Sequence, residues 1–113
     1  MQPTTINGYR WGLSEPVMLS SGIKIIAMGT ASFSVSNPSM LDGENFTEQA
    51  DSSIFNILNT VIANNLQSES SPKDIEMYVP EIVERIVPIV NEQLKQYGVT
   101  MIGMNIMGVR SAD

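Results

Sequence analysis

The carboxylates of Glu44, Glu48 and Asp51 could act together chemically, because these residues lie four and three positions apart in the sequence. On a helix this spacing would place the three carboxylates on one face. Converging carboxylates can bind Ca²⁺ or Mg²⁺, or can act as a general acid and base. They can also be first-turn acids and a cap before a helix. We favour the interpretation as first-turn acids and a helix cap, because Asp42, Gly43 and Glu44 are not followed by the further ligand spacing of a calcium-binding loop.

The other polar residues lack a catalytic pattern. The sequence has no cysteine and no histidine, which excludes thiolate nucleophiles and every mechanism that needs an imidazole. The serines do not occur in a Gly-x-Ser-x-Gly elbow. The sequence also lacks the two glycine-rich phosphate-binding motifs, Gly-x-x-x-x-Gly-Lys-Ser/Thr and Gly-x-Gly-x-x-Gly. We therefore expect no enzyme activity, no catalytic residues, no metal site and no cofactor.

The eight methionines are many for 113 residues, and three of them gather near the C-terminus. Met101, Met104 and Met107, together with Trp11, are the candidate interaction residues, because methionine adapts well to varied partners. The alternative is that methionines fill the core and that Trp11 packs inside the protein. A regular strand would place Met101 and Met107 on one face and Met104 on the other, so at least one set should be buried.

The charge balance makes several partners unfavourable. Six basic residues against twelve acidic ones give a net charge of −6, which repels phosphate backbones and anionic lipid headgroups. We expect no nucleic-acid binding and no direct membrane insertion by this segment. The N-terminus lacks a signal-peptide pattern, and no apolar run approaches the roughly 18 residues of a membrane span. These features favour a cytoplasmic location.

The pattern of apolar residues predicts four strands, at residues 17–19, 22–28, 30–36 and 99–109. Ser20, Ser21 and Gly22 predict a hairpin turn between the first two. Gly29 interrupts the next pair and is typical of a bulge or a close backbone approach. Residues 1–15 are expected to be rich in turns, with a turn at Asn7-Gly8.

Apolar residues at helical spacing predict the helices: Ile54, Ile57, Leu58, Val61 and Ile62 in the first, and Ile75 to Tyr97 in the second region. Asp51 or Ser52 would cap the first helix. In the second region we expect, in order, a cap at Ser71, a short helix near 73–79, a break at Pro80, a kink before Pro88, an end at Tyr97 and a C-cap at Gly98. Glu81 and Arg85 would form an i,i+4 ion pair.

Strands followed by helices and a last strand predict an α+β fold in a single domain over residues 1–113. Three N-terminal strands and the C-terminal strand would form a small antiparallel sheet, packed against two to three helices. The last strand would return beside an early strand.

Three stretches carry a family resemblance: Tyr9–Val17 (YRWGLSEPV), Gly29–Pro38 (GTASFSVSNP) and Leu94–Met101 (LKQYGVTM). The first is similar to a "WG-x-x-x-P-I/V" pattern, the second to "G-x-Y-S-F-x-I-x-D-P", and the third to "L-x-x-Y-G-I-x-I". Together they resemble the SPFH (Band 7) domain of stomatins, prohibitins and flotillins, in particular a bacterial virion-core-like branch. Ala31 and Asn37 depart from that branch, which often has an aromatic residue and an aspartate there.

The resemblance implies a non-enzymatic scaffold or adaptor that assembles with itself and recruits other proteins at or near a membrane. It implies a homo-oligomer of the full-length protein, cytoplasmic and peripheral to the membrane, of which residues 1–113 would be a piece. Two alternatives remain open. One is a stand-alone small-molecule or peptide-binding module whose methionine-rich strand lines a groove, and the other is a metal-dependent enzyme that uses Glu44, Glu48 and Asp51.

Overall fold

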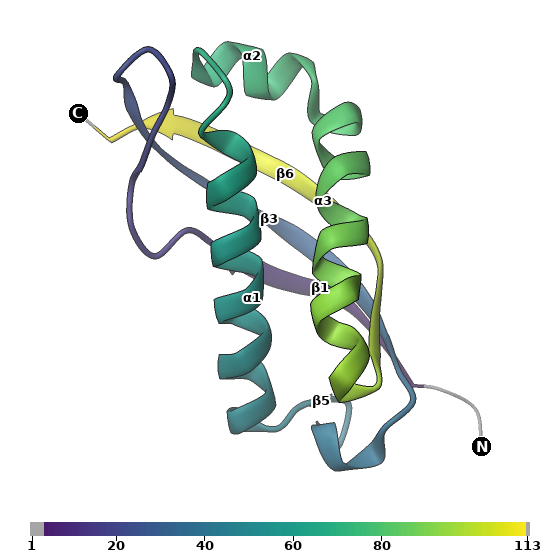
Figure 1. Ribbon diagram of the computed structural model, residues 1–113. Helices are drawn as coiled ribbons and strands as arrows, with labels where there is room; N and C mark the ends of the chain where they lie inside the picture. The colour runs from purple at the N-terminus through teal and green to yellow at the C-terminus, as the bar shows by residue number, and fades with distance from the viewer. Residues whose placement is uncertain (1–3, 113) are drawn as a thin grey trace.

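A four-stranded antiparallel sheet forms one layer of the molecule and helices form the other (Figure 1). The computed structural model describes residues 4–112. Its strands are β1 (Thr4–Gly12), β2 (Val17–Met18), β3 (Lys24–Val35), β4 (Leu41–Asp42), β5 (Asn45–Phe46) and β6 (Val99–Ser111). Its helices are α1 (Glu48–Leu66), α2 (Pro72–Met77) and α3 (Val79–Leu94), with short 3₁₀ turns η1 (Pro38–Met40) and η2 (Lys95–Tyr97). The predicted α+β class is confirmed, with three N-terminal strands and the C-terminal strand in the sheet.

Strand β3 is the centre of this sheet. Strand β6 pairs with it from Ile25 to Val35, while β1 and β2 share its other side. The expected return of the last strand beside an early strand is therefore confirmed. Strands β4 and β5 form a separate small hairpin.

The first strand was missed, because residues 1–15 were expected to be rich in turns. Residues 4–12 instead pair with β3 along its second half. The register shifts by one residue between Ile6 and Tyr9, and Gly8 there has a φ of +68°. The Asn7-Gly8 turn signal thus marks a bulge inside a strand, where the left-handed conformation of glycine is also needed. Residues 1–3 of the expected segment lie outside the described residues.

The predicted break at Gly29 is wrong, because β3 runs through it as a single strand. The predicted reason for a glycine there is confirmed. A Cβ atom at Gly29 would collide with the carbonyl oxygen of Asn105 and lie 2.9 Å from the Trp11 ring. The register with β6 also shifts between Met28 and Gly29.

Two register shifts change the faces of β6. Val99 and Met101 point into the core, then Ile106 does, and finally Val109. The shifts lie opposite the Ser32–Phe33 and Met28–Gly29 steps of β3, and each one inserts an extra residue into β6. The simple alternation that was expected for this strand is therefore wrong, because each bulge reverses which face the following residues occupy.

Helix boundaries follow local capping. Thr47, not Asp51 or Ser52, caps α1: its hydroxyl accepts a hydrogen bond from the Ala50 amide at 3.1 Å. Ser71 caps α2 as expected, accepting from the Asp74 amide at 3.2 Å. The expected break between the last two helices is confirmed, although it falls at Tyr78.

Prolines and glycine shape the rest of the helical layer. Pro80 lies in the first turn of α3, where its missing N–H costs nothing, and Pro88 is inside that helix. Gly98 ends the 3₁₀ turn that follows with a φ of +70°, so the expected C-cap is confirmed.

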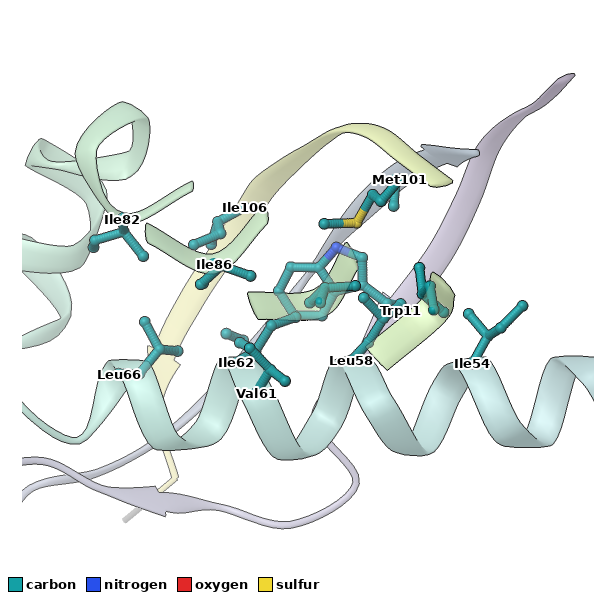
Figure 2. Close-up of a cluster of buried hydrophobic side chains, with 14 of the residues drawn as sticks. Trp11, Ile54, Leu58, Val61, Ile62, Leu66, Ile82, Ile86, Met101 and Ile106 are labelled. Atoms are coloured by element: carbon teal, nitrogen blue, oxygen red, sulfur yellow. The ribbon is translucent and has the colours of Figure 1, made fainter. Parts of the chain in front are cut away.

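The core lies between the helices and one face of the sheet. Buried side chains at helical spacing project from α1 and α3 towards Trp11, Met101 and Ile106 of the sheet (Figure 2). Those of α1 include Ile54, Leu58, Ile62 and Leu66, and those of α3 are Ile82, Ile86, Val90 and Leu94. Each such side chain contributes about 1.5–3 kcal/mol when it is fully buried, so these stripes hold the layers together.

Candidate functional site

The four candidate interaction residues lie in different environments. Trp11 is 3% exposed, and its indole N–H donates a hydrogen bond to the Thr30 carbonyl at 3.1 Å. Met101 is 1% exposed, Met104 is half-buried against the core, and Met107 is 68% exposed. The structure therefore does not bring the four together on one surface. Trp11 and Met101 are core residues, and Met107 is exposed because it occupies a bulge of β6.

The acidic candidates also separate. Glu44 lies in the turn of the β4–β5 hairpin, whereas Glu48 and Asp51 lie in the first turn of α1. Across residues 4–112 there is no group of three or more acidic side chains placed to hold a metal ion. Asp51 instead accepts a hydrogen bond from the Tyr9 hydroxyl. Burial first, and then this hydrogen bond and the charge of Asp51, raise the pKa of Tyr9 well above its ordinary value.

The most distinctive surface is the sheet face that points away from the helices. Helices α1 and α3 lie side by side on one face of the sheet (Figure 1), and no helix covers the other face in the part of the chain that the structure describes. Side chains alternate along a strand, so the neighbours of the buried residues point outwards. We call this the open face.

One end of the open face is apolar. Met28 is 53% exposed and lies between Gly12 of β1 and Gly108 of β6. Ile26 is the next outward residue of β3, and Met18 of β2 is 55% exposed. The other end is mainly polar, with Ser32, Ser34, Thr100 and Asn105, although Ile102 in the β6 bulge beside them is 59% exposed.

Two glycines leave a hollow at the apolar end. Neither Gly12 nor Gly108 has a side chain to cover Met28, and the space there has a volume of about 300 Å³. Its lining residues are Gly12, Leu13, Ile26, Ala27, Met28, Gly108, Val109 and Arg110. The hollow is therefore an apolar depression with one guanidinium group among its lining residues.

Charge is divided between the two layers. Within residues 4–112, no acidic residue lies in the four strands of the large sheet, which carry Arg10, Lys24 and Arg110. All three are exposed and alternate with the buried Trp11, Ile25 and Val109, so they belong to the open face. By contrast, the segment from Glu48 to Lys95 has eight acidic residues and three basic ones. Although the net charge is −6, the charges are therefore unevenly distributed: the open face of the sheet is basic, and the helical layer is acidic.

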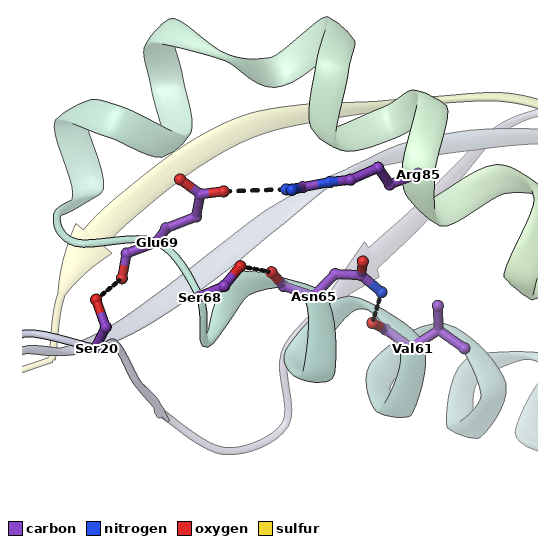
Figure 3. A network of polar contacts seen from close by, with 6 residues as sticks. All are labelled: Ser20, Val61, Asn65, Ser68, Glu69 and Arg85. Atoms are coloured by element: carbon purple, nitrogen blue, oxygen red, sulfur yellow. Dashed lines mark hydrogen bonds and ion pairs between the residues drawn. The ribbon is translucent and has the colours of Figure 1, made fainter.

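The connection between α1 and α2 is hydrogen-bonded to the turn between β2 and β3, so the acidic layer contacts the sheet layer there (Figure 3). The Ser20 hydroxyl donates to the Glu69 carbonyl at 3.0 Å, and the Ser21 hydroxyl donates to the Ser70 carbonyl at 2.6 Å. The Glu69 carboxylate pairs with Arg85 of α3 at 3.0 Å. The expected Glu81–Arg85 pair is therefore wrong, because Arg85 reaches a neighbour that is distant in sequence.

The free edge of β6 is blocked at one point. The Asn91 amide group donates to the Met101 carbonyl at 3.0 Å and accepts from the Met101 N–H at 2.6 Å. A side-chain amide thus replaces a neighbouring strand at this position. Sheet edges otherwise invite pairing with other chains, so this contact limits edge-to-edge association.

Sequence reasoning missed the open face, because it concentrated on Met101, Met104 and Met107. A signal was present: the segments of high β-propensity contain basic residues and no acidic ones. Comparison with known proteins adds no assignment, since no protein-family model and no curated protein matches this chain. Over the described residues, none of the helices has both the length and the hydropathy needed to cross a bilayer.

Proposed function

We propose that this chain is a non-enzymatic scaffold or adaptor domain that assembles with itself and recruits other proteins. The observation that carries the proposal is the open face, where Met18 and Met28 are more than half exposed beside basic residues. Exposed apolar side chains that lie together on an otherwise polar surface mark interaction sites in many proteins.

The similarity of three sequence stretches to SPFH domains supports the same function. It extends the proposal to a location at the periphery of a membrane, on the cytoplasmic side, with other membrane-associated proteins as partners. In this proposal the chain contributes protein contacts, and membrane attachment comes from elsewhere in a longer protein.

Sedimentation velocity over a wide concentration range tests the self-assembly. We expect species heavier than the 12.4 kDa monomer that grow with concentration. A sedimentation coefficient that stays monomeric at every concentration would contradict self-assembly by this chain.

A second candidate function is a stand-alone small-molecule or peptide-binding module, which the hollow beside Met28 favours. Its volume of about 300 Å³ is at the lower end for ligand sites. The fluorescent probe 1-anilinonaphthalene-8-sulfonate combines apolar rings with an anionic group that suits Arg110. Saturable binding to the native chain that is lost in Gly12→Val supports this candidate, and unchanged fluorescence on adding protein contradicts it.

A further inference from the structure

We propose that the open face of one copy binds the α2–α3 corner of a second copy. The acceptor surface is the apolar hollow around Met28 with Lys24 and Arg110 beside it. The donor surface is the acidic corner, which we define as Glu76, Met77, Tyr78 and Glu81. The inference rests on the proposed self-assembly and assigns the surfaces that perform it.

The acidic corner has the composition that the hollow requires. Met77 is 59% exposed and Tyr78 is 48% exposed at the break between α2 and α3. Exposed glutamates at positions 76 and 81 flank them. Lys73 is the basic residue of α2, and Asp74 next to it offsets its charge.

The acceptor surface is complementary in both respects. Arg110 pairs in register with Ile26, and Lys24 pairs with Met18, so each cation lies next to an apolar side chain. Desolvated apolar anchors surrounded by opposite charges give both affinity and orientation at protein interfaces. Met77 would enter the hollow, while Glu76 and Glu81 would approach Arg110 and Lys24.

A second copy fits better than an unrelated partner because the same chain carries both surfaces. Two copies with a net charge of −6 repel each other in general. A basic face is the place where that repulsion is reversed, and the acidic layer lies on the other side of the fold. Because the two surfaces differ, the contact is heterologous and can continue head-to-tail into a ring or a filament.

Charge reversal at each surface tests the proposal by sedimentation velocity. Arg110→Glu should raise the dissociation constant at least about tenfold, whereas Lys95→Glu, with the same charge change, should have no such effect. Glu76→Lys with Glu81→Lys should also weaken association, although these reversals reduce the net negative charge. The control for this pair is Glu44→Lys with Glu92→Lys, which should associate at least as well as the wild type.

Two further measurements separate a specific contact from a general charge effect. An equimolar mixture of Arg110→Glu with the double Glu76→Lys, Glu81→Lys variant should restore association, because each chain provides one unaltered surface. Gly12→Val fills the hollow without a positive φ and should weaken association, whereas Gly103→Val on the polar end of the same sheet should not. Thermal unfolding of each variant should remain cooperative, so that a loss of association reports on the surface.

The outcomes distinguish this inference from the proposed function. Loss of association in the corner and hollow variants, with rescue in the mixture, supports both. A wild-type oligomer that is unaffected by these substitutions overturns the docking proposal and leaves self-assembly standing, with another occupant on the open face. A wild-type chain that remains monomeric at every concentration overturns both.

Discussion

At the scale of single residues, Gly98 joins the helical layer to the last strand. Its φ of +70° is a conformation that side chains with a Cβ disfavour, and a Cβ there would lie 2.9 Å from the Cβ of Asn37. The Ser36 amide and hydroxyl both donate to the Gly98 carbonyl, at 2.9 and 3.0 Å. Strain at this residue would therefore also disturb the end of β3.

We predict that Gly98→Val lowers the free energy of unfolding by about 2 kcal/mol or more, from backbone strain and the clash with Asn37. Urea denaturation measures the change. Gly103→Val is the matched control, since Gly103 has no positive φ and nothing lies within 4 Å of its Cβ position. Equal stability of Gly98→Val and wild type would show that the left-handed conformation is not required.

Tyr9 connects β1 to the start of α1 and gives stability a dependence on pH. Its pKa is raised above the ordinary value of 10.0 by burial and by Asp51, so the folded state holds the phenol proton more tightly than the unfolded chain. The stability contributed by this group is therefore complete below about pH 10 and is lost as the pH rises further.

We predict that Tyr9→Phe loses less stability than wild type between pH 8 and about pH 10.5, because the phenol no longer ionises on unfolding. At neutral pH the variant should be about 1 kcal/mol less stable, since the hydrogen bond to Asp51 is lost. Urea denaturation at neutral pH, at pH 8 and at about pH 10.5 measures these differences. Tyr78→Phe, which removes the hydroxyl of an exposed tyrosine, is the control. A parallel alkaline loss in Tyr9→Phe and wild type would assign the pH dependence to other groups.

At the scale of elements, β6 is the strand whose behaviour depends most on its neighbours. It is an edge strand, it contains two bulges, and Asn91 of α3 pairs with its backbone at Met101. The bulges decide which of its side chains are buried. The Asn91 amide occupies one position of an edge that could otherwise pair with another chain.

We predict that Asn91→Ala destabilises the fold by about 1–3 kcal/mol, because it leaves the N–H and carbonyl of Met101 without their partner. It should also increase aggregation through the exposed edge. Urea denaturation and light scattering on heating measure the two effects, and Gln93→Ala, an exposed α3 residue, is the control. If Asn91→Ala matched Gln93→Ala in both measurements, the amide would have no role in protecting the edge.

At the scale of the whole molecule, the layers differ in charge and the methionines differ in exposure. The part of the chain that the structure describes measures 47 × 24 × 21 Å along its principal axes. These dimensions fit a thin two-layer body in which the helices cover one face of the sheet. Met18, Met28, Met77 and Met107 are more than half exposed, whereas Met101 is 1% exposed. Methionine sulfoxide is polar, so oxidation of the exposed set would change the surface while the core stays intact.

We predict that mild peroxide oxidises the exposed methionines first and Met101 last. Self-association should weaken while the free energy of unfolding changes little, because Met28 and Met77 belong to the proposed contact surfaces. Peptide mass mapping and sedimentation velocity on the same samples measure both. Early oxidation of Met101 would contradict its buried position, and full association after oxidation of Met28 and Met77 would contradict their role in the contact.

Local signals predicted the parts of the fold that depend on neighbours in sequence. The Ser71-Pro72 cap, the break before α3 and the Gly98 C-cap all follow from residues within a turn of each other. A glycine inside a strand pattern also indicated the close approach at Gly29, although the atoms that approach it belong to Asn105 and Trp11, which are distant in sequence. The β1 strand and the α1 cap were missed. Asn7-Gly8 has the composition of a turn, and only pairing with β3 makes its segment a strand with a bulge. Thr47 lies before Asp51 and Ser52, the caps expected for the first helix, and only the structure shows that α1 already begins at Glu48.

The sequence by itself determined the α+β class, the helical stripes, most capping signals and the lack of cysteine and histidine chemistry. Tertiary structure alone decided which methionines are exposed, because the bulges of β6 reverse its faces after Met101 and again before Val109. It also decided that the basic residues Arg10, Lys24 and Arg110, far apart in the chain, share one face. Pairing of β1 and β6 with β3 brings them together, and side-chain alternation turns all three away from the core.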